Sequence, residues 1–169
     1  MATDEPEDFD EFFRATWPRL FRTAYAVAGD AGLAEDALQS AYARAFARWG
    51  RVSAADHPEA YVRRMVVNEV LGTRRSGWWR RERPHDSAAP LGSHDGPELG
   101  VVEHDAVWEA VLGLPARQRA VVVLRYYEDL SEEQIADVLG CSRGTVKSQA
   151  SAALANLRRS ADTLKGDPR

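Results

Sequence analysis

SEEQIADVLGCSRGTVKSQASAALANL, residues 131–157, is the stretch that decides the fold of the C-terminal half. Ser131 is a good N-cap, and two acids in the next turn favour a helix start there. The helix has one apolar stripe, formed by Ile135, Val138 and Leu139. Gly140 tolerates the positive φ of a sharp corner. The first part of the stretch therefore predicts a short helix that ends at a tight turn.

Ser142 predicts the cap of a second helix, which has two different sides. One side is apolar and is expected to pack inward: Val146, Ala150, Ala153 and Leu157. The opposite side carries small or hydrogen-bonding residues: Gly144, Lys147, Ser148, Ser151 and Ala152. Such a side allows close approach to a DNA groove and offers donors there. The stretch predicts a DNA-binding helix-turn-helix; an ordinary helical hairpin with a solvated outer side is the alternative.

These residues, with VVVLRYYEDLS at 121–131, resemble the C-terminal promoter-recognition domain of bacterial RNA polymerase sigma factors. AEDALQSAYARAFARW (34–49) and PEAYVRRMVVNEVLGTRR (58–75) resemble the polymerase-binding and promoter-melting segments of the same family, in the same order. The chain has no room for the extra domains of housekeeping members. It is therefore most similar to the extracytoplasmic-function (ECF) type of the sigma-70 superfamily, in its SigE-like form. The resemblance implies a transcription initiation factor, not an enzyme.

By this resemblance the second helix of the helix-turn-helix contacts the minus-thirty-five promoter element. The residues implied are Ser142, Arg143, Gly144, Thr145, Lys147, Ser148, Ser151 and Arg158. The family often has arginine where this chain has Ala152, so one phosphate contact is expected to be absent. Arg158 and Arg159 would then contribute more of the phosphate binding.

The helix expected at 33–49 has a polar ridge opposite its alanine-rich side. A polar ridge alone is typical of a solvent-facing surface, but the resemblance implies that this one binds the clamp helices of the polymerase large subunit. The residues implied are Glu35, Asp36, Gln39, Arg44, Arg48 and Trp49, of which Trp49 can also face the core. Ser40 stands where the family usually has glutamate, so one acidic contact is expected to be missing.

In the helix expected at 58–75, a candidate DNA face lies opposite an apolar side of Val62, Met65 and Val66. In the family this helix and the preceding loop, here 51–57, capture a base flipped out of the minus-ten element, so melting needs no ATP. The residues implied are His57, Tyr61, Arg64, Asn68, Leu71, Arg74 and Arg75. Asn68 can both donate to and accept from a base edge. Tyr61 or Trp78 could stack on exposed bases; the alternatives are a core position for Tyr61 and an apolar clasp of Trp78 with Trp79.

Charge is segregated along the chain, although its sum is −4. Residues 1–40 hold nine acids against three arginines, whereas residues 58–83 hold seven arginines against three acids. Residues 143–159 hold four basic residues and no acid. The distribution favours one surface that attracts DNA and another that repels it.

The sequence predicts an all-α protein of two small helical domains joined by a flexible linker. Residues 84–100 are rich in Pro, Gly, Ser and Asp, which indicates the linker. The flanking domains are expected at 8–83 and 101–160. The first domain is expected to begin with two helical pieces around Pro18 that end at Gly29. The linker's acidity suits either mimicry of nucleic acid on the polymerase or a solubilising spacer.

Several other classes of protein fit poorly. No apolar run approaches a membrane span and the N-terminus is acidic, so a cytoplasmic location is expected. The single cysteine, Cys141, is expected to be a small core residue, and no cofactor or metal site is predicted. A response-regulator-type protein that binds duplex DNA without melting it is the main alternative, but it leaves residues 34–75 unexplained.

The expected partners are core RNA polymerase, through its clamp helices and flap, promoter DNA and an anti-sigma factor.

Overall fold

The computed structural model describes residues 8–75 and 106–166. Within these residues every regular element is a helix, which confirms the all-α prediction. The N-terminal half contains α1 (Phe9–Ala28), α2 (Ala31–Ala47), α3 (Trp49–Ser53) and α4 (Pro58–Arg75). The C-terminal half contains α6 (Ala106–Leu112), α7 (Ala116–Val122), the π-helical turn η1 (Val123–Tyr127), α8 (Glu132–Leu139) and α9 (Arg143–Lys165). The predicted linker at 84–100 and the Trp78–Trp79 pair lie outside the described residues.

Helix α1 is a single helix, so the prediction of two pieces around Pro18 is wrong. Asp8 caps its start by accepting from the backbone N–H of Asp10 at 3.1 Å. Its end is at Gly29, as predicted, in the left-handed region with φ 71°. A proline inside a helix removes one backbone hydrogen bond and costs about 3 kcal/mol. Phe12 and Leu20, on either side of Pro18, are both buried in the same core, and that packing keeps the helix continuous.

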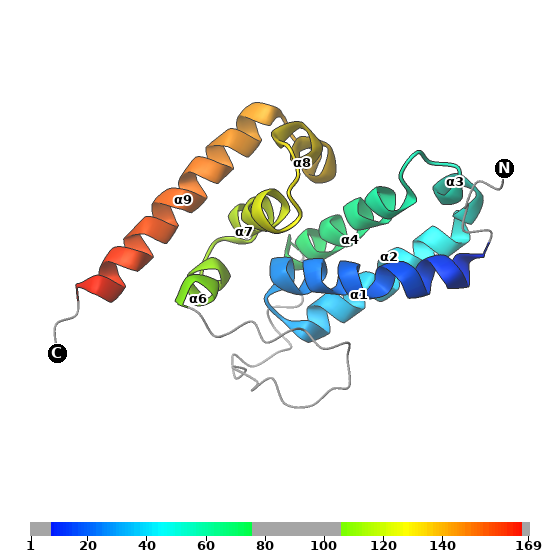
Figure 1. Cartoon of the computed structure of the whole chain (residues 1–169), viewed down its shortest axis with the longest axis horizontal. Coiled ribbons are helices and arrows are strands. Elements are labelled where there is room, and N and C mark those ends of the chain that lie inside the picture. Colours follow the sequence, from blue (N-terminus) through cyan, green and yellow to red (C-terminus); the bar gives the residue numbers. More distant parts are fainter. Residues whose placement is uncertain (1–7, 76–105, 167–169) are drawn as a thin grey trace.

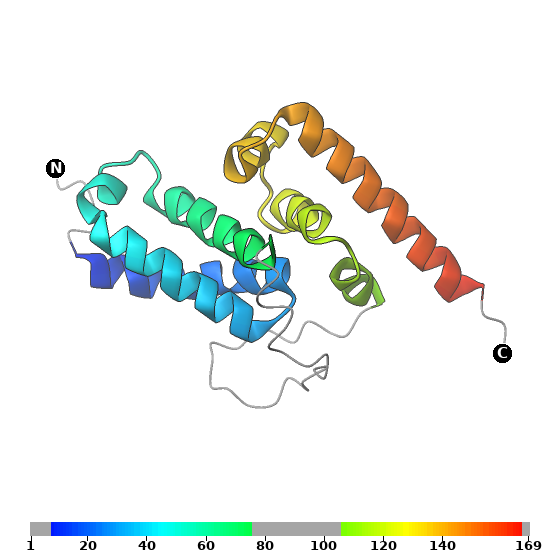
Figure 2. The same ribbon diagram turned by 180° about the vertical axis from the view of Figure 1, so that it is seen from behind.

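The N-terminal half is a bundle in which α1, α2 and α4 lie side by side (Figures 1 and 2). Helix α2 contributes small side chains to the centre of this bundle, and they are fully or almost fully buried: Ala34, Ala37, Ala41 and Ala45. Alanine side chains let neighbouring helices approach closely and favour the helical conformation. Aromatic side chains of α1 and α2 form a cluster in this bundle. In it Tyr42 packs between Phe13 and Trp17, at ring-centroid distances of 4.8 and 5.5 Å.

The C-terminal half is built around the helix-turn-helix of α8 and α9. Helix α9 runs from the corner with α8 and projects away from the rest of the molecule (Figures 1 and 2). It is longer than predicted, because it continues past residue 160 to Lys165. Its inward side is held by α7 and α8 through Val146 and Ala153, both fully buried. Most of α9 is therefore anchored on one side only.

The two halves pack against each other. Helix α4 contacts α7 and α8, and α1 contacts α7 and η1. Figure 1 shows α7 and α8 on the side of the bundle that carries α4. Most of the buried apolar residues of both halves form one cluster, in which Val66 and Val67 of α4 belong with Leu124 and Ile135. The described residues therefore form two helical units that share a core.

Candidate nucleic-acid interface

Local hydrogen bonds fix the start of α8 and the corner between α8 and α9, at the cap residues Ser131 and Ser142 that the sequence predicted. Ser131 and Gln134 form a reciprocal capping box: the Ser131 hydroxyl accepts from the Gln134 backbone N–H at 3.1 Å, and the Gln134 side chain accepts from the Ser131 N–H at 2.9 Å. Gly140 ends α8 with φ 64°. Ser142 then caps α9 by accepting from the Thr145 N–H at 3.1 Å. Because both helix ends are fixed, the corner sets the direction in which α9 projects.

The outward side of α9 is open to solvent in its first three turns and again at Arg158, further along the helix. The exposed residues among the predicted minus-thirty-five contacts are Ser142, Arg143, Gly144, Lys147, Ser148, Ser151 and Arg158. Thr145 is half-buried, and its hydroxyl lies 3.0 Å from that of Ser142. Ser148 donates its hydroxyl to the Gly144 carbonyl at 3.0 Å. The structure thus brings the predicted residues together on one surface, with Ser142 engaged in capping.

Glu132 of α8 moderates the positive charge of this surface. Its Oε2 atom lies 3.9 Å from both the Arg143 guanidinium and the Lys147 ammonium, and both basic side chains are mostly exposed. Solvent-exposed pairs at this distance contribute little to stability. The two cations can therefore leave Glu132 for another anion at small cost.

The predicted minus-ten residues of α4 do not all share one surface. His57 is exposed just before the helix, and Arg64 is exposed on it. Tyr61 is half-buried and packs against the core, which agrees with the alternative prediction of a core position for this residue. Arg74 and Arg75 stand at the end of α4, where the structure does not describe side chains. The expected loop at 51–57 is shorter than predicted, because α3 extends through Ser53.

Leu71 is a correction to the predicted DNA face. Its side chain is only 7% exposed and belongs to the core. It follows Val67 by four residues and Val70 by one, and both of those are buried. At 3.6 residues per turn, Leu71 therefore lies on the apolar side of the helix. The predicted DNA face spanned too wide an angle around α4 and so included this residue of the apolar side.

Asn68 is exposed on α4 and has a hydrogen-bond partner in the other half. Its Nδ2 atom donates to the backbone carbonyl of Val138, in the last turn of α8, at 2.9 Å. A carbonyl at a helix C-terminus has no partner inside its own helix. The side chain expected to contact a promoter base thus contacts the C-terminal half in this structure.

The predicted polymerase-binding ridge lies along α2. Glu35, Asp36, Gln39 and Arg48 are exposed. Arg44 is also exposed and forms an ion pair with Glu69 of α4. Trp49 begins α3 and is half-buried, with ring centroids 5.4 Å from Phe9 and 5.1 Å from Phe12, so it has the core position that the sequence allowed for it. Phe46, an aromatic residue of α2 outside the predicted set, is 65% exposed.

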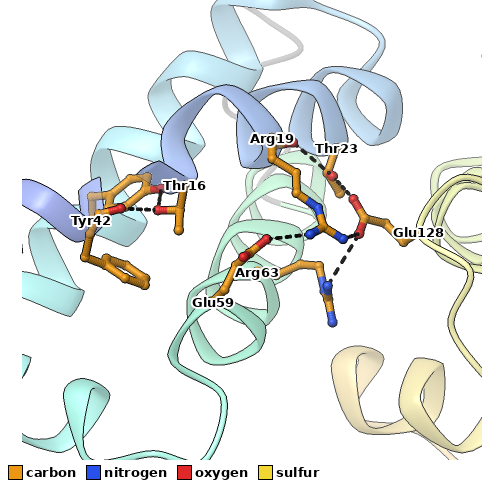
Figure 3. A network of polar contacts seen from close by, with 8 residues as sticks. Thr16, Arg19, Thr23, Tyr42, Glu59, Arg63 and Glu128 are labelled. Carbon is orange, nitrogen blue, oxygen red and sulfur yellow. Dashed lines mark hydrogen bonds and ion pairs between the residues drawn. The ribbon is translucent and has the colours of Figure 1, made fainter. Parts of the chain in front are cut away.

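Sequence reasoning also missed two buried charged residues where the halves meet. Glu128, just after η1, accepts from the Thr23 hydroxyl and pairs with Arg19 and Arg63, each at 3.4 Å (Figure 3). Arg119 of α7 is 3% exposed; it donates to the Val27 carbonyl at 2.7 Å and to the Leu112 carbonyl at 2.8 Å. No local pattern marks either residue, because most of these partners lie about a hundred positions away in the sequence.

Comparisons with known proteins place these features in a family. The family model for sigma-70 region 2 matches residues 12–80, and the model for sigma-70 region 4 matches residues 104–157. This chain belongs to the sigma-70 family. The sigma factor is 35% identical to the RNA polymerase sigma-E factor of Streptomyces antibioticus, over its whole length and 93% of that protein. It is 30% identical to the ECF RNA polymerase sigma factor SigM of Mycobacterium tuberculosis, over 89% of this chain and 76% of that one.

A solved structure has the same fold. It is described as the sigma factor RpoE in complex with the anti-sigma factor NepR from Bartonella quintana; the TM-score is 0.68 at 24% identity, covering 96% of this chain and 99% of that one. The sigma factor is of the ECF type and directs promoter-specific initiation by core RNA polymerase; it is not an enzyme. The response-regulator alternative is not favoured, because region 2 accounts for the N-terminal half. None of the described helices is long and apolar enough to cross a membrane.

Proposed function

We propose that the outward side of α9 binds the minus-thirty-five element in the major groove. The observation that carries this assignment is the exposure of Gly144, Lys147, Ser148 and Ser151 on one side of a helix whose opposite side is buried. Gly144 lets the backbone approach the DNA, while Lys147 and the two serines supply donors to phosphates or base edges. Arg143, Thr145 and Arg158 flank this surface, and Ser142 fixes its first turn.

The N-terminal half carries the other two proposed contacts. Asn68 and Arg64 of α4, with His57, Tyr61, Arg74 and Arg75 around them, bind the separated minus-ten strand. Glu35, Asp36, Gln39, Arg44 and Arg48 of α2 bind the clamp helices of core polymerase, and the C-terminal half meets the flap. In domain terms, residues 8–83 serve polymerase and the minus-ten element, residues 101–160 serve the minus-thirty-five element, and residues 84–100 connect them. The proposal includes a cytoplasmic location and an anti-sigma factor as a further partner.

Reconstitution with core RNA polymerase gives the direct test. The holoenzyme is allowed to transcribe fragmented genomic DNA. The 5′ ends of the transcripts are then mapped to identify promoters. Start sites that depend on the added sigma factor, and that share two conserved elements at a constant spacing, would support the proposal. Core polymerase that starts at the same sites without the sigma factor would contradict it.

Lys147→Ala tests the α9 assignment, and Lys165→Ala is a matched control. Both lysines are exposed on the same helix, but Lys165 is in its last turn, far from the proposed DNA surface. Lys147→Ala should weaken holoenzyme binding to the mapped promoter by about 1–3 kcal/mol if it contacts a base. If it contacts a phosphate, it should weaken all sequences alike and lower the salt slope by about one. Equal binding by both variants would show that α9 does not enter the groove at this residue.

A further inference from the structure

We infer that Arg44 of α2 is a positioning residue for the minus-ten surface. Its guanidinium neutralises Glu69, the carboxylate next to Asn68 on α4, so that the phosphates of a separated strand can approach that helix. The inference rests on the proposed role of α4 in strand binding. It gives Arg44 a second role beside the polymerase contact proposed for it, because one side chain then acts on both surfaces of the N-terminal half.

Both carboxylates of α4 are paired with arginines of other helices. Glu59, in the first turn, pairs with Arg19 of α1 at 3.3 Å. Glu69, nearer the other end, pairs with Arg44 of α2. The acids of α4 are thus neutralised from outside the helix, by two of the helices that pack on it. Arg64, which is exposed on α4, is then not needed for that purpose.

The packing of α2 on α4 brings Arg44 and Glu69 together. Ala45 directly follows Arg44 and is fully buried, and Val70 directly follows Glu69 and is also buried. Each charged side chain therefore starts at the edge of the apolar contact between the two helices. The Arg44 side chain is 53% exposed and that of Glu69 27%. The pair therefore lies at the rim of this contact, and the carboxylate is the more shielded partner.

Glu69 borders the surface proposed for the minus-ten strand. It directly follows the exposed Asn68, and it lies about two turns beyond Tyr61. A strand on this surface brings phosphates near the carboxylate, and like charges repel each other over a Debye length of roughly 8–10 Å at moderate salt. Water screens a half-buried carboxylate less than an exposed one. Without a cation beside it, Glu69 would therefore weaken strand binding.

Arginine is suited to this role. The guanidinium stays charged in proteins, and its five N–H donors form a fixed fork. One carboxylate does not use all five donors, so the pair with Glu69 is compatible with a contact to polymerase. An ion pair that is largely exposed adds little to stability. The main effect of Arg44 is therefore on the electrostatic field over α4, not on the folding of the bundle.

The test measures strand binding by holoenzyme at saturating core polymerase, by fluorescence anisotropy. The probe is a single-stranded oligonucleotide with the non-template minus-ten sequence of a promoter mapped with the holoenzyme. Arg44→Gln leaves Glu69 without its cation and should raise the Kd about threefold to tenfold. Adding Glu69→Gln to Arg44→Gln should return the Kd to within about twofold of the parent value, because the site is again neutral.

Two matched controls separate this local effect from the total charge. Arg22→Gln removes the same charge from an exposed position of α1 and should change the Kd less than Arg44→Gln. Glu11→Gln removes a carboxylate from an exposed position of α1 and should not restore binding to Arg44→Gln. The loss in Arg44→Gln should also shrink as salt rises above 0.1 M, because the Debye length falls from about 10 Å there to about 3 Å at 1 M.

Each other outcome overturns the inference. An unchanged Kd for Arg44→Gln would show that the pair does not affect the strand. A loss that Glu69→Gln does not restore would assign Arg44 to a direct strand contact, and a loss that is independent of salt would indicate damaged folding. Arg44→Lys keeps the charge and should bind the probe within about twofold of the parent, which covers the case that Arg44→Gln folds poorly.

Asn68→Ala judges the strand-binding role of α4 separately. In the holoenzyme it should raise the Kd for the same probe, and it should lower open-complex formation on duplex promoters more than on templates that are already mismatched at the minus-ten region. If Asn68→Ala weakens binding and Arg44→Gln does not, only the inference about Arg44 fails. If Asn68→Ala leaves the Kd unchanged, the proposed contact of Asn68 fails, and the Arg44 and Glu69 variants still decide their own question on the same probe.

Discussion

Tyr42 shows how a single polar group is accommodated in the core of the N-terminal bundle. Its ring is buried, and its hydroxyl lies 2.7 Å from the Thr16 hydroxyl (Figure 3). Thr16 in turn donates to the Phe12 carbonyl at 2.7 Å, so the Tyr42 hydroxyl is the donor of the pair. Burial raises the pKa of Tyr42 to about 12, and the nearby Glu59 charge adds to the effect while the Thr16 hydrogen bond opposes it. The fold therefore favours the neutral phenol.

Alkaline pH should destabilise the protein through this residue. The pKa of Tyr42 is higher in the folded chain than its ordinary value near 10, so the stabilisation is complete below pH 10 and is lost as the pH rises toward 12. The loss amounts to about 2 kcal/mol. Denaturant unfolding between pH 8 and 11.5 would measure it. Tyr42→Phe, with no group to ionise, should have a shallower slope; parallel slopes for both chains would contradict this account.

Among the elements, those with strong local signals could be predicted from the sequence. Ser131, Gly140 and Ser142 specify helix ends through bonds to residues three or four positions away, and the structure has each cap as expected. Periodicity alone was less accurate. It assigned Leu71 to the wrong side of α4, because neighbouring stripes on one helix are separated by a small angle. Pro18 led to the prediction of two pieces for α1, because the penalty of a proline is local and the packing that outweighs it is tertiary.

The α2 ridge yields a prediction that concerns one element only. Asp36→Arg should weaken binding to core polymerase about tenfold or more. The Asp36 carboxylate is proposed to face positive charge on the clamp helices, and an arginine there would be repelled by it. Asp36 is exposed, so helix content and melting temperature should be unchanged. Glu11→Arg, an equal charge reversal at an exposed position of α1, is the control. Similar losses for both variants in a competition-binding assay would indicate a general charge effect instead of a ridge contact.

At the scale of the whole molecule, the sequence predicted two helical units but not how they meet. Glu128 and Arg119 are single charged residues within otherwise ordinary helical segments, and most of their partners come from α1 or α4. Nothing local distinguishes them from solvated charges. The same holds for Asn68, whose contact with Val138 joins residues 70 positions apart. Contacts of this kind depend on packing, which a one-dimensional pattern does not encode.

Gly29 ends α1 and also lies close to residues of the C-terminal half. It has φ 71°, and a Cβ atom placed there would lie 3.1 Å from Leu112 Cδ2 and 3.3 Å from Arg119 Nη1. Gly29→Ala should therefore lower the free energy of unfolding by about 1–2 kcal/mol and lengthen the distance between the halves. Gly72→Ala, in α4, meets nothing within 4 Å and should instead stabilise by about 0.5–1 kcal/mol. Equal denaturation midpoints for the two variants would refute this interpretation.

The bonds from Arg119 to the end of α1 also have a consequence for the order of events during synthesis. Arg119 follows Ala28 by 91 residues. A ribosome that adds roughly 5–20 residues per second needs about 5–20 s to cover that distance. For that interval the nascent N-terminal bundle has the Gly29 turn at the end of α1 but not the cation that completes it. The end of α1 therefore acquires its contact with α7 only after that helix has been synthesised.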